Sequence, residues 1–481
     1  MTAGLLGAIA IAYMLILAAL ARGSETRQGR LAAIACHPLT YALALTVYFT
    51  AWAYFGEGAA LYQAGLGYLA HVTGWSFIFL FGWPWLLKAA RLVRTHHVTT
   101  LPGFFTVRYG PLPLLGGLVA VVLVTAMLPY IALQLEAVAM AIHQTAGEPV
   151  SAADQGAVLA VAVFAGVFAI LFGARGPDPT TGHRGLVLAM AVNAVVKLGA
   201  ILAVTIFAYL TFPGLAAGLA DPAAWPEVNL GARPANTYMG WMGGLLLAMA
   251  AVVLLPHMFQ IGMVESRSDE EVRLAGWAFP LYGWLFELAV LPLTAAGVLI
   301  GLRGAELERT VLAIPIAAGH MPMTILAYVG GIAAASGMAI LALLALTHLV
   351  LSDLLLPLFH RHLERLGTWL VPLRWALLMA LALAAYGLWR LIDTAYLFQS
   401  GLVSFIAVSQ LAPAFFLGLV WPGLSRRAVA WGLGLAIAVW LYTGLLPLFA
   451  GASPIVAAWV EGGPAGLALL RPQALLGVEG L

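Results

Sequence analysis

The stretch PLTYALALTVYFTAWAYFGEG, Pro38–Gly58, decides how this chain folds. It is apolar enough to enter a membrane, yet it carries threonine hydroxyls, a glutamate and a Gly-x-Gly sequence at its end. A regular spanning helix hides every backbone group, so polar side chains gathered along one indicate free backbone that faces a cavity or a ligand. We therefore predict a discontinuous helix around which a transport site is built, with Thr50 and Trp52 beside the break contacting the solute.

The composition of the whole chain predicts a membrane protein. Of its 481 residues 63% are hydrophobic and only 9% are charged, and the mean hydropathy is +0.99, far from the usage of soluble domains. Apolar runs recur about a dozen times, each near the roughly 20 residues that a helical span needs. These features predict an all-α polytopic membrane protein with about 12 transmembrane helices and the lipid bilayer around them.

Charge and motif content argue against several function classes. The net charge is +2 and the basic residues are dispersed among the loops, which gives no reason to expect a nucleic-acid partner. No motif places a nucleophile beside a base or assembles a metal site, so we expect no enzyme, no metal centre and no cofactor. The single Cys36 allows no internal disulfide.

The basic residues also predict the orientation of the chain. The apolar run at about 66–90, which we expect to form one continuous span, leads into a basic cluster of Lys88, Arg91, Arg94 and Arg108. By the positive-inside rule this cluster lies in the cytoplasm and the N-terminus lies outside. We expect a multi-pass protein of a bacterial-type cytoplasmic (inner) membrane.

The number of apolar runs predicts two related halves. Without the first and last runs about ten spans remain, and an odd number in each half forces the halves to insert with opposite orientation, as in inverted-repeat transporters. The first helix of the second half, at 238–262, is also interrupted, because Pro256 removes a backbone donor in mid-membrane. The predicted division is a leading helix and cytoplasmic loop (1–37), a first repeat (38–212), an outer loop with the second repeat (213–422), and an additional helix with a tail (423–481).

Three polar residues inside the spans are candidates for solute binding. His257, next to the proline, could hold a solute carboxylate or relay protons, or it could cap the carbonyls that the proline leaves free. Tyr130 and Gln134 share one helix face at i and i+4. They either contact a small polar solute or form hydrogen bonds between helices.

Three glutamates also lie in or near the spans. Glu57 and Glu136 could each take up a proton if desolvated, but Glu57 is close to the predicted outer end of its helix, where water would make it an ordinary carboxylate. Glu136 and Glu287 are nearer to helix interiors, and residues of this kind face the bundle or water rather than lipid.

Several stretches are similar to a known family. TLPGFFTVRYG, Thr100–Gly110, and LPYIALQL, Leu128–Leu135, resemble the sodium:solute symporter family. With SFIAVSQLAPA from Ser404, they more closely resemble the branch that forms the transporter-like input domain of membrane sensor histidine kinases. The resemblance runs from about Cys36 to the C-terminus. It implies a LeuT-type fold, two inverted five-helix repeats plus flanking helices, with substrate and cation sites near the membrane midplane. Gln410, within the last stretch, is added to the expected solute contacts.

The same resemblance implies a cation site between core helices 1 and 8. Its backbone carbonyls fall at Thr46 and Phe49, which moves the expected helix break inward from the glycines, and its hydroxyl ligand falls at Ser336. On core helix 5 the chain has Asn193 where many family members carry an acidic residue, and Lys197 follows on the same face. A buried lysine is costly unless it deprotonates, pairs or snorkels. It could take the place of Na⁺, as a lysine does in some proton-coupled relatives of this fold, so Na⁺ and H⁺ both remain open.

These observations predict a secondary active transporter, a cation:solute symporter for a small organic solute such as an amino acid or carboxylate. Alternating access would come from rocking of core helices 1, 2, 6 and 7 against the rest. The alternative is a transporter-like sensory module that binds the solute and signals to a two-component partner. The tail at 463–481 resembles the segment before a further membrane helix in the sensor branch, so we expect either a free-standing carrier or a transporter domain separated from a longer sensor.

Overall fold

The computed structural model describes residues 1–25, 29–110, 113–147, 155–173, 184–220, 238–358, 369–391, 397–451, 453–472 and 475. Within these residues the regular structure is helical and no strand occurs, as predicted. The expected outer loop begins at residue 213, and its part from 221 to 237 lies outside the described residues, as does the end of the tail.

The helices of the first half of the chain follow one another with short connections. They are α1 (Ala3–Glu25), α2 (Arg30–Ala35), α3 (Pro38–Leu45), η1 (Thr46–Tyr48), η2 (Trp52–Gly56), α4 (Glu57–Ala64), η3 (Gly65–Tyr68), α5 (Leu69–Leu80), α6 (Trp83–Thr95), α7 (Leu101–Tyr109), α8 (Pro113–Ala146), α9 (Gln155–Gly173), α10 (Arg184–Thr211) and α11 (Gly214–Ala220).

The second half has the same character. Its helices are α12 (Tyr238–Leu254), α13 (Pro256–Phe259), η4 (Gln260–Val264), α14 (Asp269–Leu299), η5 (Gly304–Arg309), α15 (Thr310–Ala317), α16 (Met321–Leu349), η6 (Val350–Leu355), α17 (Leu356–Leu358), α19 (Leu370–Trp389), α20 (Leu397–Ser409), α21 (Ala412–Val420), α22 (Arg426–Trp440), η9 (Leu441–Leu445), η10 (Leu446–Phe449), α23 (Pro454–Gly462), η11 (Pro464–Gly466) and η12 (Ala468–Leu470).

The lengths and hydropathy of these helices fit a polytopic membrane protein. In the described residues eight helices are long and apolar enough to cross a membrane, or ten if each of two bent pairs counts as one span. Two shorter apolar helices, Pro38–Tyr48 and Gln155–Leu171, come in addition. Together they agree with the roughly 12 spans predicted from the sequence.

The first core helix is broken near Thr46 and Phe49, to which the family resemblance had moved the expected break inward from the glycines. α3 passes into a short 3₁₀ turn, Thr46–Tyr48, and Phe49 then leaves the helical region with φ −78° and ψ 83°. Thr50 has no regular structure, and the chain resumes as a π-helical turn at Trp52–Gly56. The glycines at the end of the stretch are helical, so the break lies deeper in the helix.

The second predicted break is also present. α12 ends at Leu254, and α13 begins at Pro256 with a bend of 56° between them. Leu255 is extended, with φ −57° and ψ 132°, because the residue before a proline is disfavoured in the helical region. Both halves of the chain therefore carry an interrupted helix.

One expected span is different in the structure. The sequence predicted a continuous helix over 66–90, but α5 and α6 meet at an angle of 63°. The bend lies at Phe81 and Gly82, and Pro84 occupies the first turn of α6. A proline there cannot continue the hydrogen bonding of α5 across the junction, whereas it is well tolerated at a helix start.

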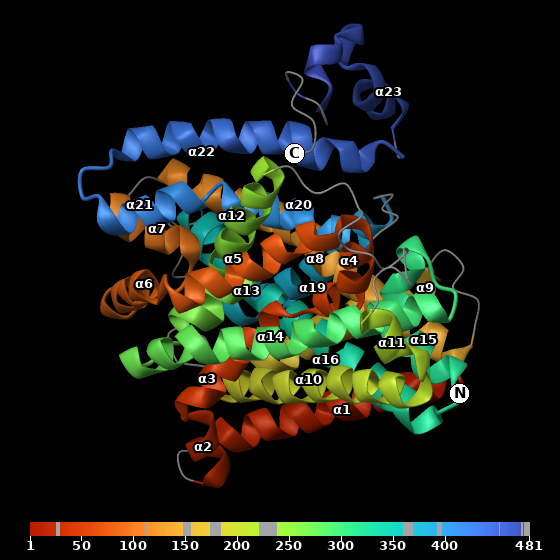
Figure 1. Ribbon diagram of the computed structural model, residues 1–481. Coiled ribbons are helices and arrows are strands. Elements are labelled where there is room, and N and C mark those ends of the chain that lie inside the picture. The colour runs from red at the N-terminus through yellow and green to blue at the C-terminus, as the bar shows by residue number, and fades with distance from the viewer. Residues whose placement is uncertain are drawn as a thin grey trace.

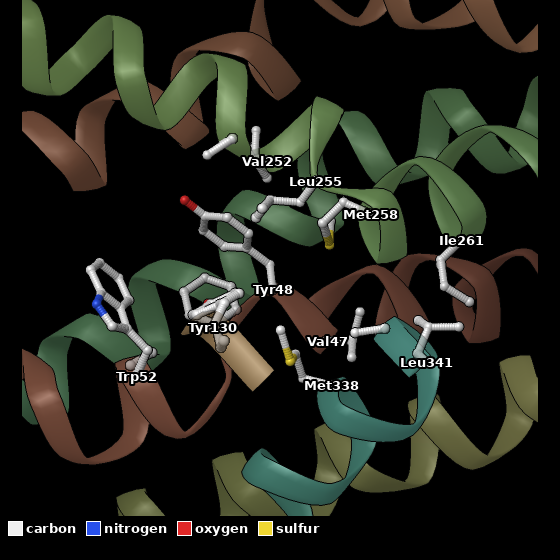
Figure 2. Close-up of a cluster of buried hydrophobic side chains, with 14 of the residues drawn as sticks. Val47, Tyr48, Trp52, Tyr130, Val252, Leu255, Met258, Ile261, Met338 and Leu341 are labelled. Atoms are coloured by element: carbon white, nitrogen blue, oxygen red, sulfur yellow. The ribbon is translucent and has the colours of Figure 1, made fainter. Parts of the chain in front are cut away.

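The packing places the broken helices at the centre of the molecule. α5 packs against α12 and α14, and α14 against α3, while α16 packs against α8 and α10. Figure 1 shows α1, α10 and α14 running side by side, with α22 and α23 on the opposite face. Figure 2 shows Tyr48, Leu255, Met258 and Met338, from both halves of the chain, gathered in one apolar cluster. The division into repeats at 38–212 and 213–422 stays a prediction.

Candidate solute and cation site

Lys197 bonds to the broken part of the first core helix. Its side chain projects from α10, is only 2% exposed, and donates hydrogen bonds from Nζ to the carbonyl oxygens of Thr46 and Phe49. These are the two carbonyls that the family resemblance assigned to a cation. An ammonium group carries three donors and no acceptor, so two backbone oxygens are suitable partners for it when buried. In this structure the Lys197 side chain is the hydrogen-bond partner of both carbonyls at the break.

The other two residues expected at the cation site bond elsewhere. Ser336 donates its hydroxyl to Ile332 of its own helix, at 2.6 Å. Asn193 accepts a hydrogen bond from the Tyr13 hydroxyl, and its Nδ2 has no partner among the described residues. Tyr13 belongs to α1, so the leading helix contributes to this region, which the sequence analysis did not foresee. No recorded hydrogen bond joins Ser336 or Asn193 to Lys197.

Three of the expected solute-binding residues form one hydrogen-bonded group. The Thr50 hydroxyl and the Tyr130 hydroxyl lie 3.1 Å apart, and Gln134 Oε1 accepts from the backbone N–H of Ala51 at 3.1 Å. Gln134 Nε2 lies 3.4 Å from Thr50 Oγ1. The polar stripe on α8 thus satisfies backbone and side-chain groups of the break. This is the interhelical role that the sequence analysis left open beside solute contact.

Trp52 lies in an aromatic cluster with two residues that the sequence analysis missed. Its ring centroid is 4.9 Å from that of His71 on α5 and 5.1 Å from that of Phe405 on α20. His71 stacks on Phe405 and hydrogen-bonds through Nε2 to the Tyr48 hydroxyl, at 3.3 Å. A histidine in an apolar span is a functional signal that could have drawn attention to His71. Phe405 carries no such signal of its own.

His257 lies one residue after the second break with no hydrogen-bond partner. It is fully buried, and neither ring nitrogen has a partner among the described residues. The alternative that it caps carbonyls freed by Pro256 is therefore wrong for this conformation. Its ring centroid lies 6.1 Å from that of Tyr130, which connects the second break to the group around the first. A buried polar side chain without partners is costly, so it needs an explanation.

Gln410 does not join this group through any recorded contact. It follows α20, is half-buried, and donates its side-chain amide to Ile406 of the same helix, at 3.1 Å. Its expected contact with the solute rests on resemblance alone, and nothing in its geometry adds to that expectation.

The expectation for Glu57 was wrong. The residue starts α4 and is 1% exposed, so it is buried and not in contact with water. Its place at the end of the apolar run predicted a position near water. Tertiary packing of η5 and α14 on α4 covers the place where water was expected.

Comparisons with known proteins show which proteins share this fold. No family model matches the chain. The uncharacterized symporter YhjB of Bacillus subtilis (strain 168) is 34% identical over 95 residues, which are 20% of this chain and 17% of that protein. A solved structure of a Na⁺-coupled sialic acid symporter, in a substrate-bound outward-open state, matches with a TM-score of 0.64 and 12% identity, over 97% of this chain and 96% of that one. The likeness confirms the LeuT-type fold and the multi-pass all-α membrane architecture.

Proposed function

We propose that this chain is a secondary active transporter, a symporter that moves a small organic solute across a bacterial-type inner membrane. Three features support the proposal. The fold is that of a Na⁺-coupled symporter, both halves carry a broken helix, and polar side chains meet where the breaks face each other. A fold alone does not fix a function, so the weight rests on the groups at the breaks.

The hydrogen bonds of Lys197 carry the proposal for the coupling ion. A cation at this place would need the oxygens of Thr46 and Phe49, and the ammonium already binds both. Burial among apolar groups disfavours the charged form of a lysine, so a buried lysine gives up its proton more easily than one in water. We infer that the coupling ion is H⁺ and that protonated Lys197 holds the broken helix against α10.

This arrangement gives a route from proton binding to movement. With its proton, Lys197 ties α10 to the break between α3 and η2. Without it, the neutral amine donates more weakly to the two carbonyls, so the tie loosens. The bundle of α3, α5, α12 and α14 is then free to rock against α8, α10 and α16. Proton release would in this way accompany solute release.

The groups around the breaks indicate the class of solute. Trp52, His71 and Phe405 offer aromatic surface, while His257 and the hydroxyl of Tyr130 offer hydrogen bonds. An imidazole N–H can donate to a carboxylate, which would satisfy the unpartnered His257. We propose an amino acid or another small carboxylate as the solute. Because these side chains are packed together and buried here, binding requires that they part.

Two alternatives make different predictions. Sodium coupling draws support from the similar structure, which is of a Na⁺-coupled symporter. The sensory module, which would signal to a two-component partner, rests on the sequence resemblance alone. Its expected behaviour is solute binding with no transport.

Uptake into proteoliposomes tests the proposal. Candidate amino acids and carboxylates are first screened by thermal stabilisation of the purified protein. Uptake of each stabilising compound is then driven by a pH gradient alone or by a Na⁺ gradient alone. We expect uptake with the pH gradient and none with Na⁺ alone. Strict dependence on Na⁺ would overturn the proton assignment, and binding without counterflow would favour the sensory module.

The lysine can also be observed directly. The chain contains two lysines, Lys88 and Lys197. With lysine labelled at the ε-carbon, magnetic resonance should give two signals, and Lys88 serves as the internal reference. We expect the Lys197 signal, identified by its loss in Lys197→Ala, to shift with pH in the folded protein. A Lys197 signal that does not change with pH while the protein stays folded would argue against a proton-exchanging Lys197.

A further inference from the structure

Two buried glutamates, Glu57 and Glu287, take no part in the hydrogen bonds of Lys197. Glu57 at the start of α4 is 1% exposed, and Glu287 in α14 is 8% exposed. Each carboxylate has one oxygen that is fully buried and without a hydrogen-bond partner among the described residues, Oε2 of Glu57 and Oε1 of Glu287. Unpartnered carboxylate oxygens in a protein interior are costly, so both oxygens need a hydrogen-bond donor.

Tyr68 brings the two carboxylates together. It ends η3, just before α5, and its hydroxyl donates to Glu287 Oε2 at 2.7 Å. The charges of Glu57, Glu287 and Tyr68 act on one another, and α4, which carries Glu57, packs against α14 and η3. The phenol has a single proton to donate, so it cannot satisfy both carboxylates. The site therefore combines two acidic groups from α4 and α14 with one donor between them.

No ion pair compensates the two carboxylates in the described residues. The titratable and charged groups on the elements around the pair are Tyr48, Tyr54, Tyr68, His71, Tyr130, Lys197, Tyr282, Glu306, Glu308 and Arg309. Lys197 is bound to the backbone of the first break. The ion pairs of Asp269 with Arg91 and Arg94 do not include Glu57 or Glu287. Two buried carboxylates in one region cannot both be charged without a large cost.

We propose that Glu57 and Glu287 form a proton-binding pair that holds one shared proton in this conformation. The proton comes from water and forms an O–H bond on one carboxyl, which donates to the unpartnered oxygen of the other. The net charge of the pair is then −1, and Tyr68 donates to the charged member. This site is separate from Lys197 and gives the protein a second place to carry a proton.

The position of the pair explains how proton exchange is controlled. α4 packs against η5 and against α14, so the pair is enclosed where those three elements meet. Leu307 of η5 lies close to the neighbouring Gly58. A Cβ added to Gly58 would be 3.4 Å from the carbonyl oxygen of Leu307. Water reaches the carboxyls only when α4 and η5 separate. Proton exchange at this site is therefore tied to movement of the first core helix.

Infrared spectroscopy of the full purified chain tests the proposal, because a protonated carboxyl and a carboxylate absorb at different frequencies. We expect a protonated-carboxyl band at neutral pH that shifts in Glu57→Gln and in Glu287→Gln and is lost in the double variant. Glu461→Gln, which changes an exposed glutamate on α23, should leave the band unchanged. Spectra are recorded in potassium buffer and again with Na⁺ at the same pH.

Several results would overturn the proposal. They are the absence of the band at neutral pH, its persistence in the double variant, and its removal by Na⁺ at constant pH, which would make the pair a sodium site. If the double variant does not fold, Tyr68→Phe provides the second test. Loss of the phenol destabilises the charged form, so proton affinity should rise about tenfold, equivalent to one pH unit. An unchanged titration in Tyr68→Phe would count against the pair.

The measurement does not depend on the proposed transport function. It uses no solute and no gradient, so failure to observe transport would leave the expected band in place. Conversely, absence of the band would leave the Lys197 proposal untouched.

Discussion

The ammonium group of Lys197 donates to the carbonyl oxygen of Phe49 over 2.5 Å, at the residue where the first core helix loses its helical geometry. One side chain from α10 thus replaces the hydrogen bonds that the interrupted helix cannot make for itself. Since the same nitrogen also binds Thr46, the lysine spans the short 3₁₀ turn before the break. A helix break inside a membrane is stable only when its free backbone groups find partners, and here the partner is a charged group.

Replacing this lysine should create a requirement for sodium. Lys197→Ala leaves the oxygen of Phe49 buried without a donor and leaves the oxygen of Thr46 with only the backbone N–H of Phe49, which should lower the free energy of unfolding by about 1–3 kcal/mol. A small cation coordinated by oxygen could then enter, so the variant should unfold at higher temperature in NaCl than in KCl. The wild type should show no such difference. Equal unfolding of the variant in both salts would contradict the idea that the lysine stands in for a cation.

Gln134 should matter for stability as well as for solute binding. Its Oε1 accepts from Ala51 N–H, a backbone donor that the break leaves free. Gln134→Ala removes that acceptor, and we expect the free energy of unfolding to fall by about 1–3 kcal/mol. Thermal unfolding in detergent measures the change. The control is Gln63→Ala, at an exposed position of α4, which should change little. Similar behaviour of the two variants would show that Gln134 does not support the break.

The lack of a side chain at Gly401 should be needed for the Trp52 ring to pack against α20. A Cβ at this position of α20 would lie 2.3 Å from Cδ1 of the indole. Gly401→Ala must therefore displace Trp52 or α20, and overpacking of this kind costs about 1–3 kcal/mol. We expect weaker solute binding together with a lower unfolding temperature. Gly432→Ala in α22, where nothing lies within 4 Å, is the matched control and should be neutral or stabilising. Unchanged affinity in Gly401→Ala would place the solute away from Trp52.

His257 should lower the stability of the protein but be required for solute binding. Both of its ring nitrogens are buried without partners in the described part of the chain, so His257→Leu removes unsatisfied polar atoms and should raise the free energy of unfolding of the solute-free protein by about 1–3 kcal/mol. The same change should abolish solute binding and uptake. His71→Leu makes a useful contrast, because it removes the hydrogen bond to Tyr48 and should destabilise the protein. Solute uptake that survives in His257→Leu would exclude the histidine from the binding site.

Much of the fold could be predicted because it depends on local properties of the sequence. Burying about 20 apolar residues in a membrane requires a helix, so the runs of the chain predicted the spans. A proline in mid-span removes a backbone donor at a fixed place, and the break at Pro256 lies where the sequence put it. The bend between α5 and α6 was missed, although Gly82 and Pro84 mark it, because the apolar run over 66–90 has the length of a single span.

The sequence by itself determined the helical membrane class, both broken helices, and the presence of a lysine and a histidine in places where burial makes polar groups costly. Tertiary structure alone decided what those groups meet. Lys197 lies 148 positions from Phe49, and Glu287 lies 219 from Tyr68, so no periodicity along the chain could show that their atoms are neighbours. Burial was also decided by packing. Glu57 stands at the end of an apolar run, and only the elements folded over it remove it from water, because exposure depends on what covers a residue and not on its place in the sequence.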